Sequence, residues 1–281
     1  MARIARRWLH RTGEIVLDRT RIMGVLNVTP DSFSDGGRYL DPGDAVHRGL
    51  EMVEQGADLV DIGGESTRPG SVAVPPEEEW RRVGPVLEGL SRRVDAPLSV
   101  DTRRPVIAER ALASGASIVN DVSGLRDPQM IRLLARSRAG AVVMHTLGDP
   151  GTMQENPAYR DVLGEVRGFL EGRVRVALAE GVPRESMAVD PGIGFGKSLD
   201  HNLELLRHLD VLADLGQTVV IGVSRKSFLG RIGGADPGGR LPEGLAAATF
   251  AALQGAHVVR THDVAETAKA MRVVDALRPR S

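Results

Sequence analysis

The residues from Ile22 to Gly37, IMGVLNVTPDSFSDGG, combine a strand-like run with a dense set of polar side chains. An apolar, β-favouring run ends abruptly at Asn27 and leads into a polar loop that two glycines close. The loop carries amide, hydroxyl and carboxylate groups on Asn27, Thr29, Asp31, Ser32, Ser34 and Asp35. A buried strand followed by such a loop delivers polar groups to the mouth of a site. One junction of this kind is an ordinary turn, but the pattern returns along the chain.

Polar or charged residues stand at the ends of nearly all the strand-like runs. They are Asn27; Asp61 and the run GGESTRPG (63–70); Asp101 and Thr102; Asn120 and Asp121; His145; Asp190; Ser224, Arg225, Lys226 and Ser227; and Arg260, His262 and Asp263. Buried carboxylates and amides need partners, so their convergence at one mouth indicates a ligand site. Any one of them could instead cap the following helix, and this alternative stays open for Asp121 and Asp263.

Short β-type runs alternate with amphipathic, helix-like segments, and this order predicts the fold class. The predicted strands are 22–28, 59–63, 98–101, 117–121, 141–145, 187–190, 218–222 and 256–261. The predicted helices are 45–55, 77–94, 105–113, 129–136, 159–179, 202–215, 244–253 and 265–277. Eight such units in about 250 residues predict an α/β fold, a closed (β/α)8 TIM barrel with its active site at the carboxyl ends of the strands. The alternative is an open doubly wound sheet, but no glycine-rich dinucleotide fingerprint follows the first strand.

No linker or composition shift divides the chain, so we predict one domain over residues 1–281. The stretch from Gly233 to Gly239 is predicted to be a flexible loop. The basic start, MARIARRWLHRTGE, is predicted to be a short strand or arm that closes the bottom of the fold.

The composition excludes several classes of protein. The chain is 42% hydrophobic and 26% charged, which is typical of a soluble globular protein, and it has no run near the ~18 apolar residues of a membrane span. A net charge of −1 with interspersed signs predicts no nucleic-acid partner. The absence of cysteine rules out disulfides and thiolate chemistry and fits a cytoplasmic protein. Lysine is nearly absent, since only Lys197, Lys226 and Lys269 occur among 36 basic residues, and the first two lie within polar motifs.

Residue spacing sharpens two of these motifs. Arg260 and His262 are two residues apart, so they point the same way if the last strand persists that far, and together they would bind an anion. The loop DPGIGFGKS (190–198) is rich in glycine, which lets the backbone approach a flat ligand closely.

Assembled in order, these motifs closely resemble those of the dihydropteroate synthase family. The matching blocks are MGVLNVTPDSFSDGG (23–37), DIGGESTRPGS (61–71), SVDT (99–102), IVNDVSG (118–124), VVMH (142–145), MQENPAY (153–159), DPGIGFGKS (190–198), GVSRKSFLG (222–230) and RTHDV (260–264). They cover the chain from about residue 14 to its end, and their combination is highly specific. The one departure is Thr261, where the family usually has a small aliphatic residue, but the spacing is retained.

The resemblance implies a transferase of folate biosynthesis. Such an enzyme joins 6-hydroxymethyl-7,8-dihydropterin pyrophosphate to 4-aminobenzoate, releases pyrophosphate and forms 7,8-dihydropteroate. Sulfonamides would be competitive ligands in place of aminobenzoate. The resemblance also implies a homodimer that packs through the late helices.

The resemblance further assigns residues to each part of such a site. The pterin edge would bind to Asp101, Asn120, Asp190 and Lys226, with Met144 and Val122 lining the slot and Arg260 covering one face. Pyrophosphate would bind to Arg260, His262, Arg68 and Asn27, the last of these by way of Mg²⁺. Aminobenzoate would contact Phe33, Thr67, Pro69, Phe195 and Ser227. The residues implied in catalysis are Asp35, Asp101, Asp190, Lys226 and Arg260.

This chemistry suits a dissociative, SN1-like substitution. An arylamine is a weak nucleophile, pyrophosphate on Mg²⁺ is a good leaving group, and an electron-rich dihydropterin can stabilise a cation on its methylene. Such a reaction needs no covalent nucleophile, but it needs carboxylates for the cation, cationic groups for the leaving charge, and loops that exclude water. Asp101 and Asp190 would meet the first need, and Arg260, His262, Arg68 and Mg²⁺ the second.

Two rival interpretations share part of this pattern. A pterin-binding methyltransferase domain has the same barrel and pterin contacts, but it has no need of the NVTPDSFSDGG loop or of the RKS and RTH anion groups. A non-catalytic pterin-binding or scaffold protein would be expected to lose one of these sets. Release of pyrophosphate from the two substrates together separates all three.

Overall fold

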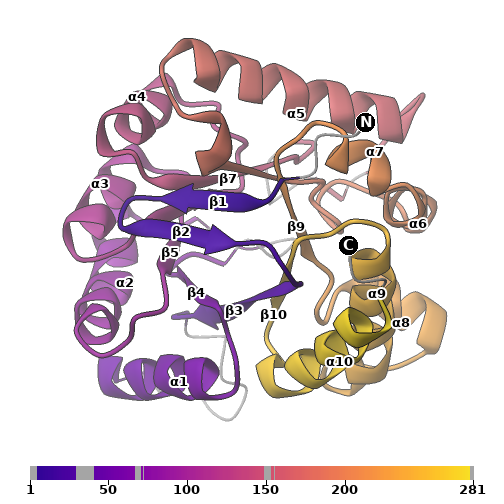
Figure 1. The fold of residues 1–281 in the computed structure, drawn as a ribbon, viewed down its shortest axis with the longest axis horizontal. Helices are drawn as coiled ribbons and strands as arrows, with labels where there is room; N and C mark the ends of the chain where they lie inside the picture. Colours follow the sequence, from indigo (N-terminus) through magenta and orange to yellow (C-terminus); the bar gives the residue numbers. More distant parts are fainter. Residues whose placement is uncertain are drawn as a thin grey trace.

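The fold is a ring of eight parallel strands surrounded by helices, seen in a computed structural model that describes residues 5–29, 41–66, 71, 73–148, 153–154 and 156–278 (Figure 1). The barrel strands are β3 (Arg21–Asn27), β4 (Leu59–Gly63), β5 (Leu98–Asp101), β6 (Ile118–Asp121), β7 (Gly140–Met144), β8 (Met187–Asp190), β9 (Thr218–Gly222) and β10 (Val258–Thr261). The order around the ring is β10-β3-β4-β5-β6-β7-β8-β9, with β9 pairing back to β10. The prediction of a closed barrel is confirmed, and the open-sheet alternative is wrong.

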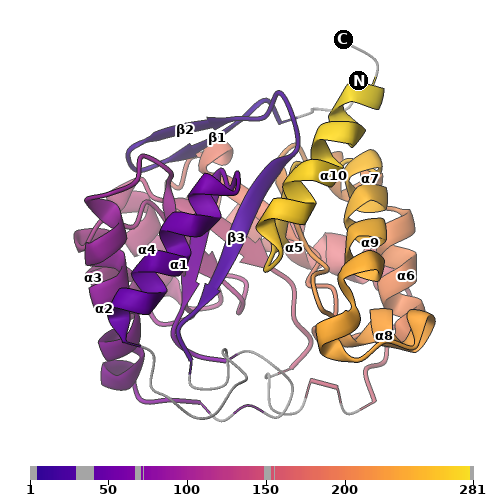
Figure 2. The same cartoon turned by 90° about the horizontal axis from the view of Figure 1, so that it is seen from below.

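Helices follow the strands and cover the outside of the barrel. They are α1 (Pro42–Glu54), α2 (Pro76–Ser91), α3 (Pro105–Ala113), α4 (Pro128–Ser137), α5 (Val162–Ala179), α6 (Leu199–Arg207), α7 (Asp210–Ala213), α8 (Ser227–Gly233), α9 (Leu241–Leu253) and α10 (Val264–Leu277), with short 3₁₀ helices η1 (Arg184–Ser186) and η2 (Pro237–Gly239). Figure 2 shows this layer from the side. None of the helices in the described ranges has the length and apolar character that crossing a membrane requires.

Local sequence signals set where many helices begin. Proline is the first residue of α1, α2, α3 and α4, a position where its missing N–H costs no hydrogen bond. The side chains of Asp41, Asp127 and Asp161 accept hydrogen bonds from backbone N–H groups in the first turns of α1, α4 and α5. At α6, Ser198 and His201 bond reciprocally to each other's backbone N–H groups.

The two-residue period of the strands divides the barrel interior into two layers. The lower layer is apolar and comprises Met23, Leu59, Ile118, Val142, Ala188, Val220 and Val258. Two residues further along these seven strands, the inward positions hold Val25, Asp61, Asn120, Met144, Asp190, Gly222 and Arg260. On β5, Ser99 and Asp101 stand at the two levels, where they pair with Ile118 and Asn120. The carboxyl ends of the strands therefore carry a layer of polar groups directly above the apolar layer, and the site lies at this polar layer.

A two-stranded hairpin closes the bottom of the barrel. The antiparallel strands β1 (Arg7–His10) and β2 (Gly13–Val16) lie across this end of the barrel (Figures 1 and 2). They pair Trp8 with Ile15, and both side chains pack against the apolar floor. The Trp8 ring is fully buried, and its Nε1–H donates to the carbonyl of Ser186 at 3.0 Å. The prediction that the N-terminal segment closes the bottom of the fold is confirmed, but the segment forms a two-stranded hairpin and not a single short strand.

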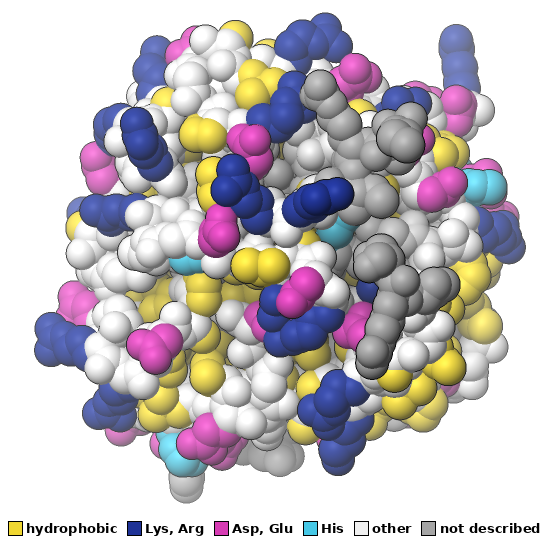
Figure 3. Space-filling model, in the orientation of Figure 1, with side chains coloured by type: hydrophobic (Ala, Val, Ile, Leu, Met, Phe, Trp, Pro, Cys, Tyr) yellow, Lys and Arg dark blue, Asp and Glu magenta, His cyan; other side chains and the backbone are white. Residues whose placement is uncertain are grey.

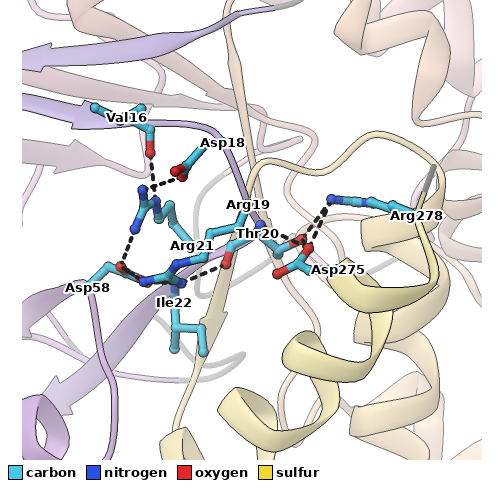
Figure 4. Close-up of polar contacts among 9 residues, drawn as sticks. All are labelled: Val16, Asp18, Arg19, Thr20, Arg21, Ile22, Asp58, Asp275 and Arg278. Atoms are coloured by element: carbon cyan, nitrogen blue, oxygen red, sulfur yellow. Dashed lines mark hydrogen bonds and ion pairs between the residues drawn. The ribbon is translucent and has the colours of Figure 1, made fainter. Parts of the chain in front are cut away.

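Ion pairs tie the segment after the hairpin to both sides of the barrel (Figure 4). Asp58, just before β4, accepts from the side chains of Arg19 and Arg21 and from the backbone N–H of Ile22 at 2.9 Å. On the other side, Asp275 of α10 accepts from the backbone and hydroxyl of Thr20. The start of β3 is thus fixed in register with its neighbours.

Two predicted segments differ from the structure. The predicted helix 202–215 is two helices, α6 and α7, because His208 leaves the helical conformation (φ −121°, ψ 37°) and the buried Leu209 turns the chain. The predicted flexible loop at 233–239 contains the last residue of α8 and the 3₁₀ helix η2. Helix α8 itself, which begins at Ser227, was not predicted.

Candidate active site

A narrow cleft opens at the carboxyl ends of the barrel strands, on the side opposite the hairpin (the lower end of the barrel in Figure 2). It encloses about 330 Å³ with its open mouth included. The residues that line it are Asp101, Asn120, Val122, Met144, Asp190, Gly192, Ile193, Phe195, Gly222, Lys226 and Arg260. All six residues predicted to contact pterin therefore line one cavity, as do Val122 and the predicted aminobenzoate residue Phe195. Their roles toward ligands stay predictions.

A network of ion pairs fixes the centre of the cleft. Arg260 donates from Nε to Asp61 Oδ2 at 2.7 Å and from Nη2 to Asp101 Oδ2 at 2.9 Å. The same Asp61 oxygen accepts from Nδ2 of Asn120 at 2.9 Å. In the described part of the chain, Nη1 of Arg260 has no hydrogen-bond partner. Two carboxylates thus hold the guanidinium in one orientation and leave one of its donor nitrogens for a ligand.

Asp61 is the one central residue to which the sequence assigned no role. Its side chain is completely buried, so it does not line the cleft, and it acts through Arg260 and Asn120. The strand period contained a signal, because Asp61 lies two residues after the inward-facing Leu59. The sequence contained no signal that Asp61 would pair with Arg260, since the two residues are 199 positions apart.

Burial raises the pKa of both carboxyl groups that line the cleft. Burial raises the pKa of Asp101 to about 7; the positive charge of Arg260 opposes this rise, and the negative charge of Asp61 adds to it. Burial also raises the pKa of Asp190, whose Oδ1 accepts from the backbone N–H of Gly192 at 2.7 Å. A cationic or N–H-donating ligand would compensate these carboxylates, so the cleft is suited to such a ligand.

Lys226 and Phe195 form the wall beside Asp190. The ammonium of Lys226 lies 4.0 Å from the centre of the Phe195 ring, within cation–π distance. Burial, with the positive charge of Arg260, lowers the pKa of Lys226 to about 8. Lys226 is therefore a hydrogen-bond donor whose charge depends on its anionic neighbours.

His262 does not share the strand face of Arg260, which was expected if the last strand persisted that far, because strand β10 ends at Thr261. Nδ1 of His262 instead lies 3.1 Å from Oγ of Ser224, at the end of β9. Burial and the positive charge of Arg260 lower the pKa of His262 to about 3. A bound anion would raise this pKa again, so the contact of His262 with pyrophosphate stays a prediction.

The remaining predicted site residues divide into two groups. Asn27 ends β3, half-buried beside the cleft, and Ser227 is exposed at the first residue of α8, directly after Lys226. Neither lines the cleft within the described residues. The predictions for Phe33, Asp35, Thr67, Arg68 and Pro69 lie outside the residues that the structure describes.

The two ambiguous aspartates do not face the cleft. Asp121 accepts from the backbone N–H groups of Ser123 and Leu125, at 2.8 and 3.1 Å, and so fixes the turn after β6. Asp263 makes no side-chain cap of α10 and instead pairs with Arg225 at 2.5 Å. Both hold the loops around the mouth in place.

A magnesium ion needs oxygen ligands, and the described mouth offers few. No group of three or more His, Cys, Asp or Glu side chains in the described ranges could hold a metal alone. Mg²⁺ in phosphate-transfer sites usually takes one or two protein oxygens and completes its shell with phosphate and water. The half-buried amide of Asn27 fits that sparse arrangement, so the residues present are compatible with a metal that arrives with a pyrophosphate.

Fold and site together define a (β/α)8-barrel enzyme whose strand ends form a slot for a flat, hydrogen-bonding ligand. The family described as "Pterin binding enzyme" matches residues 23–262. Dihydropteroate synthase of Neisseria meningitidis serogroup C is 46% identical over 275 residues, which cover 96% of this chain and 97% of that protein.

Solved structures agree with this relationship. Dihydropteroate synthase of Xanthomonas albilineans with 4-aminobenzoic acid has a TM-score of 0.92 and 45% identity, covering 98% of this chain and 100% of that chain. The Yersinia pestis dihydropteroate synthase with a sulfonamide drug has a TM-score of 0.92 and 40% identity, covering 96% and 98%. The X. albilineans enzyme with 7,8-dihydropteroate has a TM-score of 0.88 and 43% identity, covering 97% and 100%. The chain belongs to the dihydropteroate synthases of the pterin-binding enzyme family.

Proposed function

We infer that this chain condenses 6-hydroxymethyl-7,8-dihydropterin pyrophosphate with 4-aminobenzoate, forming 7,8-dihydropteroate and pyrophosphate. The observation that carries this function is the single cleft that gathers the acceptors Asp101, Asn120 and Asp190 with the donors Lys226 and Arg260. It agrees with the ligands of the related enzymes, which include aminobenzoate and the product 7,8-dihydropteroate. The protein is therefore a transferase of folate biosynthesis.

The donors and acceptors of the cleft complement the edge of a pterin. The aminopyrimidinone edge carries several N–H donors and one carbonyl oxygen. The carboxylates of Asp101 and Asp190 and the carbonyl of Asn120 can accept those protons, while the ammonium of Lys226 can donate to the oxygen. Met144 and Val122 line the cleft with apolar surface suited to the faces of the ring. The narrow shape then selects a flat bicyclic ligand.

We propose that the substitution is dissociative. The bond between the pterin methylene and pyrophosphate breaks with its electron pair going to the leaving oxygen, and the amine lone pair then forms the carbon–nitrogen bond. The amine loses a proton to the departing pyrophosphate or to water. Asp101 and Asp190 stabilise the positive charge on the pterin because they are fixed beside it in a buried site. The free Nη1 of Arg260 is the donor that can meet the leaving charge.

We propose that Mg²⁺ assists the departure of pyrophosphate, with Asn27 as a protein ligand. The metal would neutralise the leaving negative charge, as divalent cations do in other phosphate-transfer sites. His262, whose pKa burial lowers to about 3, would gain a proton or donate from its ring N–H when pyrophosphate is present. Arg68 would add a further positive charge from the loop that follows β4.

The aminobenzoate side of the site is proposed to combine Phe195 and Ser227 with the first two loops. Phe33, Thr67 and Pro69 would contact the ring, and Asp35 would assist the catalytic step. Sulfonamides would bind in the same place, as a sulfonamide drug binds a related enzyme. Water would be excluded once both loops are closed.

We further propose a cytoplasmic homodimer. Four apolar side chains on the neighbouring helices α9 and α10 are exposed: Phe250 (43%), Leu253 (60%), Val273 (60%) and Leu277 (77%). Figure 3 shows hydrophobic side chains gathered along the lower right edge of the molecule, where these helices lie, whereas positive and negative groups are interspersed elsewhere on this face. A second copy would cover this surface. The cysteine-free composition supports a reducing compartment.

The test of the function is pyrophosphate release from the purified chain. We expect release only when the pterin pyrophosphate and 4-aminobenzoate are both present with Mg²⁺, and we expect 7,8-dihydropteroate as the co-product. Methyl transfer from a folate donor, or pterin binding without turnover, would support one of the rival functions instead. Sedimentation of the same sample tests the homodimer.

A further inference from the structure

Lys197 is a buried lysine for which neither the fold nor the proposed reaction accounts. Only 3% of its surface is exposed, at the end of the loop between β8 and α6. Its ammonium lies 2.9 Å from the carbonyl oxygen of Phe195 and 3.0 Å from Nδ1 of His145. No carboxylate in the described ranges forms an ion pair with it. Burial accordingly lowers its pKa to about 7, against the attraction of Asp190. A buried cation without a contacting anion is costly, so its retention needs a reason.

The loop that Lys197 ends is difficult to order. Gly192, Gly194 and Gly196 all have a left-handed backbone, with φ of +67°, +79° and +62°. Glycine loses more conformational freedom on ordering than any other residue. A loop with three such residues holds its shape only if other groups fix it.

Three different side chains fix three successive carbonyls of this loop. The carbonyl of Gly194 accepts from Gln154 at 2.6 Å, that of Phe195 from Lys197 at 2.9 Å, and that of Gly196 from Tyr159 at 2.9 Å. The only ammonium among these donors meets the carbonyl of Phe195, whose ring lines the cleft. A hydrogen bond from a charged donor is about twice as strong as a neutral one.

The second contact of Lys197 joins this loop to the end of the neighbouring strand β7. His145 follows Met144, a cleft residue, and its backbone N–H donates to the carbonyl of Asp190 at 2.9 Å. The imidazole is neutral, because burial and then Lys197 lower its pKa to about 3. Its Nδ1 therefore accepts from the ammonium, and its ring packs edge-on against Phe169 with centroids 5.0 Å apart. Lys197 thus connects two strand ends.

We propose that Lys197 is a positioning residue for aminobenzoate: its ammonium fixes the backbone of Phe195 against His145 and so holds the Phe195 ring in place as a wall of the aminobenzoate pocket. Lys197 does not itself line the cleft, so it acts through Phe195. The same ring supports the ammonium of Lys226. The proposal rests on the proposed function, in which Phe195 faces aminobenzoate and the deeper carboxylates face pterin.

The test is a comparison of the two substrates in Lys197→Met and Lys197→Gln. Methionine fills the same volume without a donor, and glutamine returns a neutral donor. We expect Lys197→Met to raise KM for 4-aminobenzoate by about tenfold, as loss of one charged hydrogen bond implies, with KM for the pterin pyrophosphate within about twofold of wild type. We expect the KM of Lys197→Gln for 4-aminobenzoate to lie between the values of wild type and Lys197→Met. Lys269→Met, on the exposed face of α10, is the matched control and should leave both KM values unchanged.

The absence of cysteine allows a rescue experiment. Lys197→Cys can be unfolded and alkylated at its single thiol with 2-bromoethylamine, where the thiolate displaces bromide and leaves a side chain that ends in an ammonium. After refolding, we expect the alkylated protein to regain most of the aminobenzoate affinity that unmodified Lys197→Cys has lost. If Lys197 only filled space, returning the charge would not restore the affinity for aminobenzoate.

Three outcomes would overturn the proposal. They are an equal rise of both KM values, a fall in kcat alone, and an alkylated protein no better than its unmodified form. Variants that no longer bind pterin in a calorimetric titration would mean that Lys197 holds the whole fold, which also contradicts it. Failure of the wild-type protein to release pyrophosphate would refute the proposed function instead, so the two failures are distinguishable.

Discussion

The buried carboxylate of Asp61 offers the sharpest test of how the site is organised. Its Oδ2 accepts from both Arg260 and Asn120, while Oδ1 has no partner within the described residues. In Asp61→Asn, the amide oxygen can therefore keep both hydrogen bonds and the amide nitrogen can occupy the place of Oδ1. The substitution removes a charge and leaves the geometry nearly intact.

Two effects of the lost charge follow from the structure. A hydrogen bond to a charged group contributes about 1.5–3 kcal/mol. In Asp61→Asn only the guanidinium of the pair stays charged, so we expect the bond to Arg260 to lose up to about half of this, roughly 1.4 kcal/mol. This predicts a loss of about tenfold in kcat/KM at pH 8. The negative charge of Asp61 also helps to raise the pKa of Asp101 to about 7. Without it that pKa falls, so Asp101 stays ionised to lower pH.

The measurement is the pH profile of kcat/KM for the pterin pyrophosphate, which reports groups of the free enzyme. If ionised Asp101 is required, the acid limb of the wild-type profile lies near pH 7, and Asp61→Asn moves it to lower pH. Asp58→Asn is the control, because Asp58 also pairs with arginines but at the bottom of the barrel (Figure 4). An acid limb that stays in place or moves upward in Asp61→Asn would refute the argument.

The remaining predictions concern Arg260, the metal, the loops and the hairpin. Arg260→Lys keeps the charge but cannot span Asp61 and Asp101, so we expect kcat/KM to fall about 10²-fold or more, equivalent to ~2.7 kcal/mol; near-normal kinetics would contradict this. EDTA should weaken binding of the pterin pyrophosphate, and affinity undiminished by EDTA would exclude a metal-assisted role for Asn27. If the first two loops close over pyrophosphate, calorimetry should show a sulfonamide binding roughly 5–150-fold more tightly with pterin, pyrophosphate and Mg²⁺ present, a coupling of about 1–3 kcal/mol, whereas equal affinities would mean a preformed pocket. Trp8→Ala empties the barrel floor and should lower the free energy of unfolding by about 3–5 kcal/mol, as denaturant titration would measure.

Much of the fold could be read from local patterns. The alternation of strand-like and helix-like periods placed eight strands within about two residues of their observed bounds. The errors arose where tertiary contacts overrode the pattern. The amphipathic run 202–215 breaks at His208 because Leu209 is drawn into the core, and the hairpin forms because Trp8 and Ile15 are needed to cover the open floor.

In the site, too, local sequence patterns predicted some features of the side chains and tertiary contacts decided others. Motif order alone indicated that Asp101, Asn120, Asp190, Lys226 and Arg260 would meet, and they line one cleft. It could not indicate that His262 turns to Ser224 and has a lowered pKa, because burial in the finished fold sets both its partner and its pKa.

The sequence by itself therefore determined which residues stand at the strand ends, since a period of two along a strand and the strand–helix alternation are local properties. Only the tertiary structure decided how those residues pair. Closure of the barrel brings Asp61 within 2.7 Å of Arg260 although 199 residues separate them. It also removes the water that would otherwise screen their charges, so the raised pKa of Asp101 and the unusual burial of Lys197 exist only in the folded chain.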